Sequence, residues 1–299
     1  MTASSAATAA TSGQTRITGF VPPVATPFRD GRVDLTGFRR MLEDLAPHVQ
    51  GVLVGGSVGE SPSLDFEEKA ALMRAAAGEL GATHSLALSI SDNSIETSRR
   101  LSEIAGECGA DVLMVLAPNY YGNDLAMLEA YFAAVSEFAS ADLCLYDNPI
   151  ASHTQLSVAD IVALQRAAPR VTHVKVTDLA LEKVTALRER TSLVVLSGDD
   201  AVLWGQLARG AEGAMVALPM IYPERAAAIW RAFSAGDLEA ADSEYRHVAR
   251  FIHLALGQPD YVAVIKTVLQ GRGVLESAEV RVPLVPLTAT RRDEVLAAL

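Results

Sequence analysis

The chain has 299 residues, of which 50% are hydrophobic and 20% charged, with a formal net charge of -11. This composition is typical of a soluble globular protein, and the acidic balance argues against a nucleic-acid partner, which needs clustered lysine and arginine. No apolar stretch reaches the roughly 18 residues of a membrane helix. The two cysteines, Cys108 and Cys144, lack the paired spacing of a zinc site or a disulfide framework, so we expect a cytoplasmic protein.

Residues 1–15 are small and polar, without the basic and apolar regions of a secretory signal, and we expect them to form a disordered tail. From Ile17 onwards, short apolar runs alternate with longer amphipathic stretches. The runs are ITGFVPPVATPF, GVLVGG, HSLALSI, DVLMVLAP, DLCLYDNP, VTHVKV, SLVVLSG and GAMVAL. Near-continuous apolar strands joined by helices indicate a parallel sheet that is buried on both faces.

Eight such units favour a closed (β/α)8 TIM barrel over an open, doubly wound sheet, although periodicity alone does not separate the two α/β folds. Helical periodicity is clear at residues 35–48, 65–80, 94–109 and 125–139, and Asp65 and Ser157 are typical helix N-caps. After the eighth run the pattern turns helical, from Tyr222 through Gln270. We therefore predict a barrel over residues 16–221 and a C-terminal helical extension, packed on the barrel, over residues 222–299.

Lys175 is the most informative residue of the apolar runs, because it lies in the sixth run between two valines. Polar residues near the ends of barrel strands face the active site. Burial favours the neutral form of an amine, and only the neutral amine attacks a carbonyl. The alternative is that Lys175 is paired with a carboxylate such as Asp178 or Asp199.

Tyr146 ends the fifth run, whose strand precedes that of Lys175. Neighbouring strands lie roughly 5 Å apart, so inward-facing side chains at matching heights meet. A phenol beside an amine can move protons during Schiff-base chemistry. A tyrosine that only makes a structural hydrogen bond is the other interpretation.

The second run ends in GGSVGES, residues 55–61, whose glycines permit a tight turn that directs backbone N–H groups and the Ser57 hydroxyl at an anion. The carboxylate of a keto acid suits this turn. The segment also matches the G-x-S-x-G elbow of serine hydrolases, with Ser57 as nucleophile. Against that reading, residues 61–63 intervene before the next helix, only one strand precedes Ser57, and only His153 among the downstream histidines is in a loop.

No phosphate loop, dinucleotide turn or H-E-x-x-H helix is present in the sequence, so we expect neither a metal nor a nucleotide cofactor.

Taken together, six segments resemble the dihydrodipicolinate synthase and N-acetylneuraminate lyase family of class I aldolases, in the right order and over nearly the whole chain. GFVPPVATPF is similar to the opening strand of that family, GGSVGES to its G-T-T-G-E-S loop and APNYY to its P-Y-Y segment. LYDNP is similar to its Y-N-x-P, VKVTD to its lysine strand and LSGDD to its S-G-x-D turn.

The resemblance implies a role for each matching residue. Lys175 would form the Schiff base, Tyr146 would shuttle protons, and Ser57 would relay protons and help to seat the carboxylate. Tyr120 falls where a tyrosine from a neighbouring subunit often completes the relay. Gly198 and Met215 match positions that line the keto-acid pocket. The resemblance also implies a homotetramer built as a dimer of dimers.

Four positions bear on the substrate. Val58 replaces the second threonine of the loop and removes one hydroxyl from the carboxylate site. Ala151 stands where the lysine-pathway enzymes of the family carry an arginine that grips a second carboxylate, which argues against synthesis of dihydrodipicolinate. Asn148, at a position that is commonly apolar, and His153 are candidates for contact with a different substrate.

We therefore predict a lyase that makes or breaks a C–C bond of pyruvate or a related 2-keto acid, with an aldehyde as the second small-molecule substrate. Its only covalent group would be the Schiff base on Lys175, and no membrane or nucleic-acid partner is expected. Three alternatives stay open: a dehydratase of keto-deoxy sugar acids in the same family, a non-catalytic keto-acid-binding protein, and a serine hydrolase using Ser57.

Overall fold

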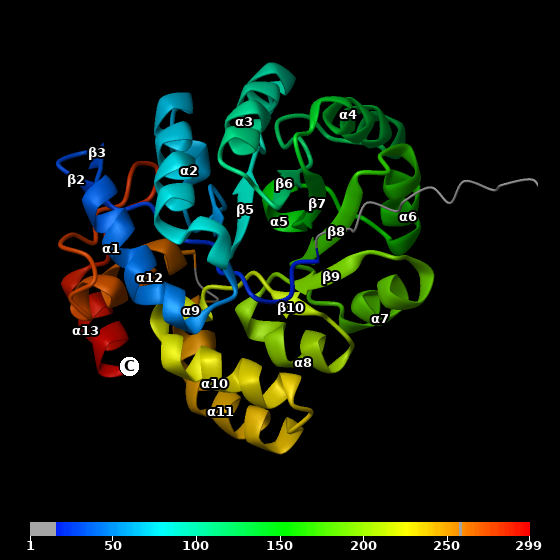
Figure 1. Cartoon of the computed structure of the whole chain (residues 1–299). Helices are drawn as coiled ribbons and strands as arrows, with labels where there is room; N and C mark the ends of the chain where they lie inside the picture. Colours follow the sequence, from blue (N-terminus) through cyan, green and yellow to red (C-terminus); the bar gives the residue numbers. More distant parts are fainter. Residues whose placement is uncertain (1–15, 257–258) are drawn as a thin grey trace, which may run out of the picture.

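Eight parallel strands form the centre of the molecule (Figure 1) in a computed structural model that describes residues 16–256 and 259–299. The predicted tail of residues 1–15 lies outside the described residues. The strands are β1 (Gly19–Phe20), β4 (Gly51–Val54), β5 (Ser85–Ser89), β6 (Val112–Leu116), β7 (Asp142–Asp147), β8 (Val171–Val176), β9 (Val194–Ser197) and β10 (Gly213–Ala214). Each lies inside one of the eight predicted apolar runs.

The strands close into a barrel. They are hydrogen-bonded in the order β1-β10-β9-β8-β7-β6-β5-β4. The two ends of that order meet where the Gln50 N–H donates to the Phe20 carbonyl at 3.0 Å and the Leu53 N–H donates to the Pro22 carbonyl at 2.9 Å. The predicted (β/α)8 barrel is therefore confirmed, and the open doubly wound sheet is excluded.

The first apolar run differs from a simple strand. Only Gly19–Phe20 pair within the barrel, and a small antiparallel hairpin follows, formed by β2 (Phe28–Arg29) and β3 (Arg32–Val33). Its turn residues Asp30 and Gly31 both have positive φ, at 51° and 75°. Asp-Gly is a typical sequence for such a turn, because both residues tolerate this backbone conformation.

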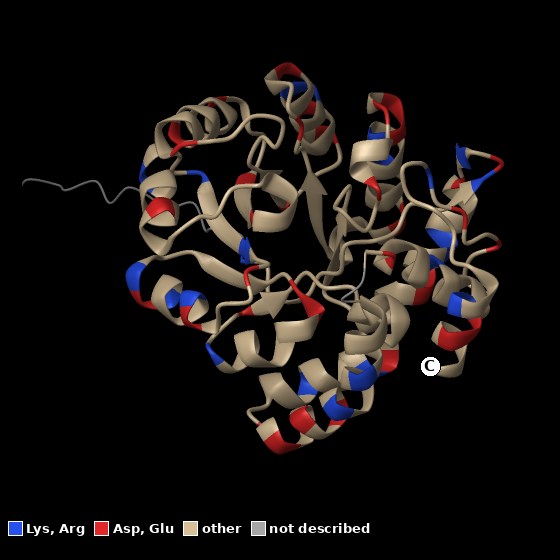
Figure 2. Ribbon diagram, turned by 180° about the vertical axis from the view of Figure 1, so that it is seen from behind, with Lys and Arg blue, Asp and Glu red and all other residues tan. Residues whose placement is uncertain are grey.

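Helices surround the barrel (Figure 1). They are α1 (Leu35–Leu45), α2 (Phe66–Leu80), α3 (Ile95–Glu107), α4 (Leu125–Phe138), α6 (Val158–Ala167), α7 (Leu181–Arg190) and α8 (Leu203–Ala208), with the short α5 (Pro149–Ser152) and α9 (Leu218–Ile221). The predicted caps are confirmed: Asp65 and Ser157 form capping boxes with Glu68 and Asp160. Acidic and basic residues are interspersed along the outer helices (Figure 2).

The C-terminal part consists of α10 (Pro223–Ser234), α11 (Leu238–Phe251), a π-helical turn (Ile252–Leu256), α12 (Tyr261–Gly271) and α13 (Ala289–Ala297). Figure 1 shows α12 and α13 beside α1, and α10 and α11 as a pair next to α8. The domain boundary after residue 221 stays a prediction, since α10 contacts both β1 and α11. No helix in the described ranges is long and apolar enough to cross a membrane.

Two apolar layers hold the barrel together. The interior is filled by side chains such as Leu53, Met114 and Met215, while a larger cluster lies between the strands and the helices. His173 belongs to the interior side of β8 and is fully buried, where its Nε2 accepts a hydrogen bond from the Ile17 N–H at 3.2 Å. Burial lowers the pKa of His173 to about 4, so it is a neutral core residue at physiological pH.

This buried histidine predicts a pH-dependent stability. The folded-state pKa of about 4 lies below the ordinary value of 6.5, so the unfolded chain binds more protons between these values, and stability falls as the pH drops from about 6.5 to 4. We expect wild-type protein to lose about 3 kcal/mol more unfolding free energy over this range than His173→Gln. Urea unfolding of both proteins at several pH values measures the difference, and parallel pH profiles would contradict the prediction.

Candidate active site

A cavity of about 460 Å³ opens at the carboxyl ends of the barrel strands. Most of the predicted site residues share it: the lining includes Ser57, Val58, Tyr146, Asn148, Lys175, Gly198 and Met215. These residues come from loops and strands far apart in the sequence, and the carboxyl-end face of a barrel is where active sites form. Two predicted residues lie elsewhere. Tyr120 is 80% exposed and His153 is also exposed, and neither lines the cavity.

Lys175 and Tyr146 are brought together by the pairing of β7 with β8. Their Cα atoms are register partners, and the Lys175 Nζ lies 4.2 Å from the centre of the Tyr146 ring. Both side chains are buried, with 3% and 6% of their surfaces exposed. The alternative partners for Lys175 are not realised within the described residues, because Asp178 pairs with Lys183 and no ion pair joins Lys175 to a carboxylate.

Tyr146 lies among hydrogen-bond donors. The Asn148 Nδ2 donates to its hydroxyl oxygen at 2.8 Å, and the Ser57 side chain lines the same cavity. Burial by itself raises the pKa of Tyr146, but the charge of Lys175 and the hydrogen bonds from Ser57, Asn148 and Lys175 outweigh it and leave the pKa lowered. These contacts favour the phenolate form, which accepts a proton.

Asn148 has a second role in local structure. Its Oδ1 accepts a hydrogen bond from the Ala151 N–H at 3.1 Å, which caps the short helix α5. The side chain therefore fixes the segment after β7 with one end and contacts the Tyr146 hydroxyl with the other. Asn148 also lines the cavity, so its contact with a substrate stays a prediction beside its hydrogen bond to the tyrosine.

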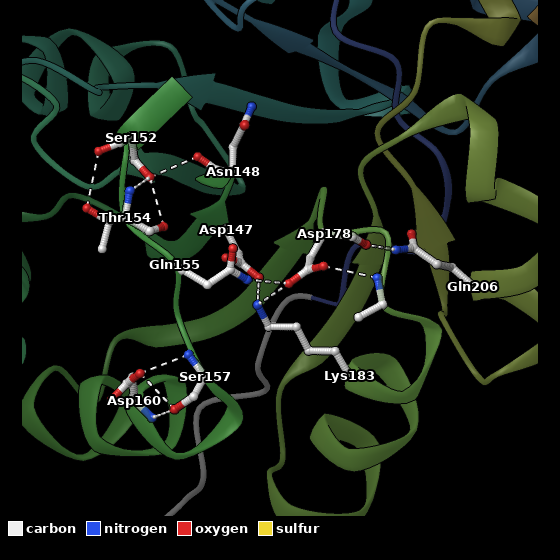
Figure 3. Close-up of polar contacts among 11 residues, drawn as sticks. Asp147, Asn148, Ser152, Thr154, Gln155, Ser157, Asp160, Asp178, Lys183 and Gln206 are labelled. Carbon is white, nitrogen blue, oxygen red and sulfur yellow. Dashed lines mark hydrogen bonds and ion pairs between the residues drawn. The ribbon is translucent and has the colours of Figure 1, made fainter. Parts of the chain in front are cut away.

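An ion-pair cluster holds the ends of β7 and β8 on the outer side of the barrel. Figure 3 shows Lys183 of α7 between Asp147, which directly follows Tyr146, and Asp178. Gln155 donates to Asp178 at 2.7 Å, and Gln206 donates to the Asp178 carbonyl at 3.0 Å. Burial raises the pKa of the Asp147 carboxyl, against the opposing effect of Lys183. This cluster fixes the strand ends that carry the cavity-facing pair.

Hydrogen bonds and a buried ion pair hold the loop that carries Ser57. Thr26 donates to the Gly59 carbonyl at 2.7 Å, and the loop turns sharply at Glu60, which has a positive φ of 54°. The buried Glu60 carboxylate pairs with Lys266 of α12 and accepts a hydrogen bond from the Arg281 N–H at 2.8 Å. Both members of the Glu60–Lys266 pair are fully buried, so the C-terminal extension supports the loop that carries Ser57.

The structure gives Ser57 no histidine base. A second cavity of about 270 Å³ also touches Ser57 and Tyr146, and no histidine is found among the described residues that line either cavity. After the loop, a 3-10 turn at Ser61–Ser63 precedes α2, so Ser57 does not lead straight into a helix. The arrangement therefore lacks the Ser–His contact that a serine hydrolase needs.

The far wall of the cavity is made by Gly198, Asp199 and Asp200. A Cβ on Gly198 would lie 2.5 Å from the Thr177 Oγ1 and 3.0 Å from the Lys175 Cγ, so only glycine leaves the lysine its place. Asp200 accepts hydrogen bonds from the N–H groups of Ala217 and Leu218, and its burial raises its pKa to about 6. The sequence analysis missed Asp200 and also Tyr261, which reaches the cavity from α12.

Comparisons with known proteins identify the family of the chain. The model of the dihydrodipicolinate synthetase family matches residues 16–299. The chain belongs to this family. It is 31% identical over 280 residues to the 4-hydroxy-tetrahydrodipicolinate synthase of Moorella thermoacetica, covering 92% of this chain and 95% of the relative, and 30% identical over 274 residues to that of Corynebacterium aurimucosum, covering 91% and 89%.

Solved structures agree with the family assignment. A putative dihydrodipicolinate synthetase from Pseudomonas aeruginosa superposes with a TM-score of 0.90 at 25% identity, covering 95% of this chain and 99% of that one. YagE of Escherichia coli, a family member described in complex with pyruvate, superposes with a TM-score of 0.88 at 25% identity, covering 94% and 96%. The family assignment makes the chain a lyase of the class I aldolase type.

The support of the Ser57 loop leads to a stability prediction. Lys266→Met leaves Glu60 buried without its partner, which costs about 3–5 kcal/mol of unfolding free energy. As a control, Arg246→Met breaks an ion pair with Asp242 on the surface of α11, where Arg246 is 77% exposed, and is expected to cost at most about 1 kcal/mol. Urea unfolding measures both changes, and a Lys266→Met protein as stable as the control variant would disprove the anchoring role.

Proposed function

We propose that this protein is a Schiff-base lyase that acts on pyruvate or a related 2-keto acid through Lys175. The observation that carries the proposal is the buried Lys175 amine, which is free of carboxylate ion pairs in the described part of the chain, next to the Tyr146 phenol in a cavity. A buried amine and a phenol whose pKa is lowered form a nucleophile and base pair that simple ligand binding does not need.

The proposed reaction uses residues of this chain only. The Lys175 amine adds to C2 of the keto acid, and the former carbonyl oxygen leaves as water to give the iminium. The Tyr146 phenolate takes a proton from C3, and the C–H electron pair forms the enamine. The enamine carbon attacks the aldehyde carbon, the aldehyde oxygen takes the proton that Tyr146 holds, and water releases the product from Lys175. In the cleavage direction the same steps run in reverse.

No cofactor enters these steps, so we propose that the Schiff base on Lys175 is the only covalent group needed. We also propose that the protein is a homotetramer built as a dimer of dimers. The exposed aromatic pair of Tyr120 and Tyr121, with ring centres 5.1 Å apart, supports a contact between copies of the chain.

The Schiff base is tested by borohydride reduction in the presence of pyruvate, followed by intact-mass measurement. We expect one reduced pyruvate per wild-type chain and none on Lys175→Ala, because the alanine variant lacks the attacking amine. Absence of an adduct with pyruvate and with other 2-keto acids would refute the proposed function.

The charged residues that line the cavity limit the chemical class of the second substrate. Among the described lining residues Lys175 is the only cation, while Asp199 and Asp200 contribute carboxylates. Ala151 lies on the cavity wall, and no arginine that could grip a second carboxylate is among the described lining residues. We therefore propose an aldehyde that carries no carboxylate of its own, such as a hydroxylated aldehyde, rather than the substrate implied by the names of the relatives.

This preference predicts the outcome of Ala151→Arg. The new arginine is expected to raise kcat/KM for an aldehyde with a carboxylate, such as succinic semialdehyde, about tenfold or more, because a charge-assisted hydrogen bond contributes about 1.5–3 kcal/mol. Glyceraldehyde, which is neutral, should gain nothing, and Ala151→Leu controls for added bulk. Wild-type protein that prefers the carboxylate-bearing aldehyde would overturn the proposed specificity.

A further inference from the structure

A second phenol reaches the cavity from the C-terminal extension. Tyr261 is the first residue of α12 and lines the same cavity as Ser57, Tyr146 and Lys175. The charge of Tyr146 raises the pKa of Tyr261, and the Ser57 hydroxyl lowers it. The helix that carries it is anchored by Lys266, which pairs with the buried Glu60 of the Ser57 loop.

Ser57 therefore shares the cavity with two tyrosines of its own chain, Tyr146 and Tyr261. Its hydroxyl lowers the pKa of both phenols. A hydroxyl donates one hydrogen bond and accepts up to two, so a donor on one side leaves the proton of Ser57 free to point to the other. Within a single chain, Tyr120 is exposed and lines neither cavity that touches Ser57.

We propose that Tyr261 is a positioning residue of the reaction, whose hydroxyl donates to the Ser57 Oγ and so directs the Ser57 proton at the Tyr146 phenolate. The inference rests on the proposed function of Lys175 and Tyr146 and adds a third hydroxyl from the same chain. In the step concerned, the C3–H bond of the iminium breaks, its proton goes to the Tyr146 oxygen, and its electron pair forms the enamine.

The pKa values of the two phenols are shifted in opposite directions, as this arrangement requires. Burial raises the pKa of Tyr261, and the nearby charge of Tyr146 raises it further, so Tyr261 keeps its proton and stays a donor. The pKa of Tyr146 is lowered by Lys175 and its hydrogen bonds, which outweigh its burial, so Tyr146 is the group that gives up its proton. Two titratable groups whose environments drive their pKa values apart take different roles.

The decisive measurement is the exchange of the pyruvate C3 protons with D2O, followed by proton NMR on the full-length protein. This exchange needs only pyruvate, Lys175 and the base, and no aldehyde. We expect Tyr261→Phe to form the borohydride-trapped adduct as wild type does, because Lys175 is intact. Its exchange rate should fall about tenfold, because the Ser57 hydroxyl is no longer aligned with the Tyr146 phenolate and their charge-assisted hydrogen bond is lost.

The pH profile separates positioning from mere packing. Without Tyr261 the Ser57 donor is no longer aligned and the pKa of Tyr146 rises, so the acid limb of the exchange profile should move up by about one pH unit, and alkaline pH should restore part of the rate. Phenylalanine keeps the ring. Tyr131→Phe is the matched control, because it also removes a buried hydroxyl. Tyr131 lies on helix α4, and its hydroxyl donates to the Asp92 carbonyl at 3.3 Å.

Three outcomes overturn the proposal: Tyr261→Phe exchanging at the wild-type rate, a lower rate with an unshifted acid limb, or Tyr120→Phe slowing the exchange while Tyr261→Phe does not. A wild-type chain that forms no trapped adduct refutes the proposed function itself, a result that is distinct from these three because in each of them the adduct forms.

Discussion

The site depends on one irregularity in the pairing of β7 with β8. Leu143 pairs with Val171, but the next partners along the strands are Cys144 and His173, so Thr172 is an extra residue on β8. Val171 faces the outer core, while His173 and Lys175 face the barrel interior. A bulge of one residue reverses the faces of all later side chains, so the extra residue turns Lys175 inward and places it level with Tyr146.

The bulge matters because no carboxylate of the described residues pairs with the amine to orient it. Lys175 makes no carboxylate ion pair in the described ranges, and its place is fixed by the Tyr146 ring, by the glycine at position 198 and by the strand ends. The cluster of Asp147, Lys183 and Asp178 holds those ends from outside the barrel. These three charged residues thus pair with one another, and Lys175 is left for the ligand.

Sequence patterns predicted the parts of this arrangement that are local. Eight apolar runs correspond to the eight strands, and the helix caps at Asp65 and Ser157 follow from short-range hydrogen bonding. The neighbourhood of Lys175 and Tyr146 followed from strand order. The Asp30-Gly31 hairpin was missed although its turn sequence is a known signal. The bulge at Thr172 has no such signal, because it arises from the fit between two strands.

Tyr261 was missed for a different reason. It stands in a helical stretch more than two hundred residues after Ser57, and helical periodicity says nothing about which loop of the barrel its first turn meets. The C-terminal extension looked like an appendage in the sequence, yet Lys266 anchors it to Glu60 in the same loop as Ser57. A buried ion pair is costly to form unless its geometry is fixed, and this one fixes helix and loop relative to each other. The positions of Tyr261 and Ser57 are therefore fixed relative to each other. A hydroxyl of the extension needs such a fixed position to orient a hydroxyl of the barrel.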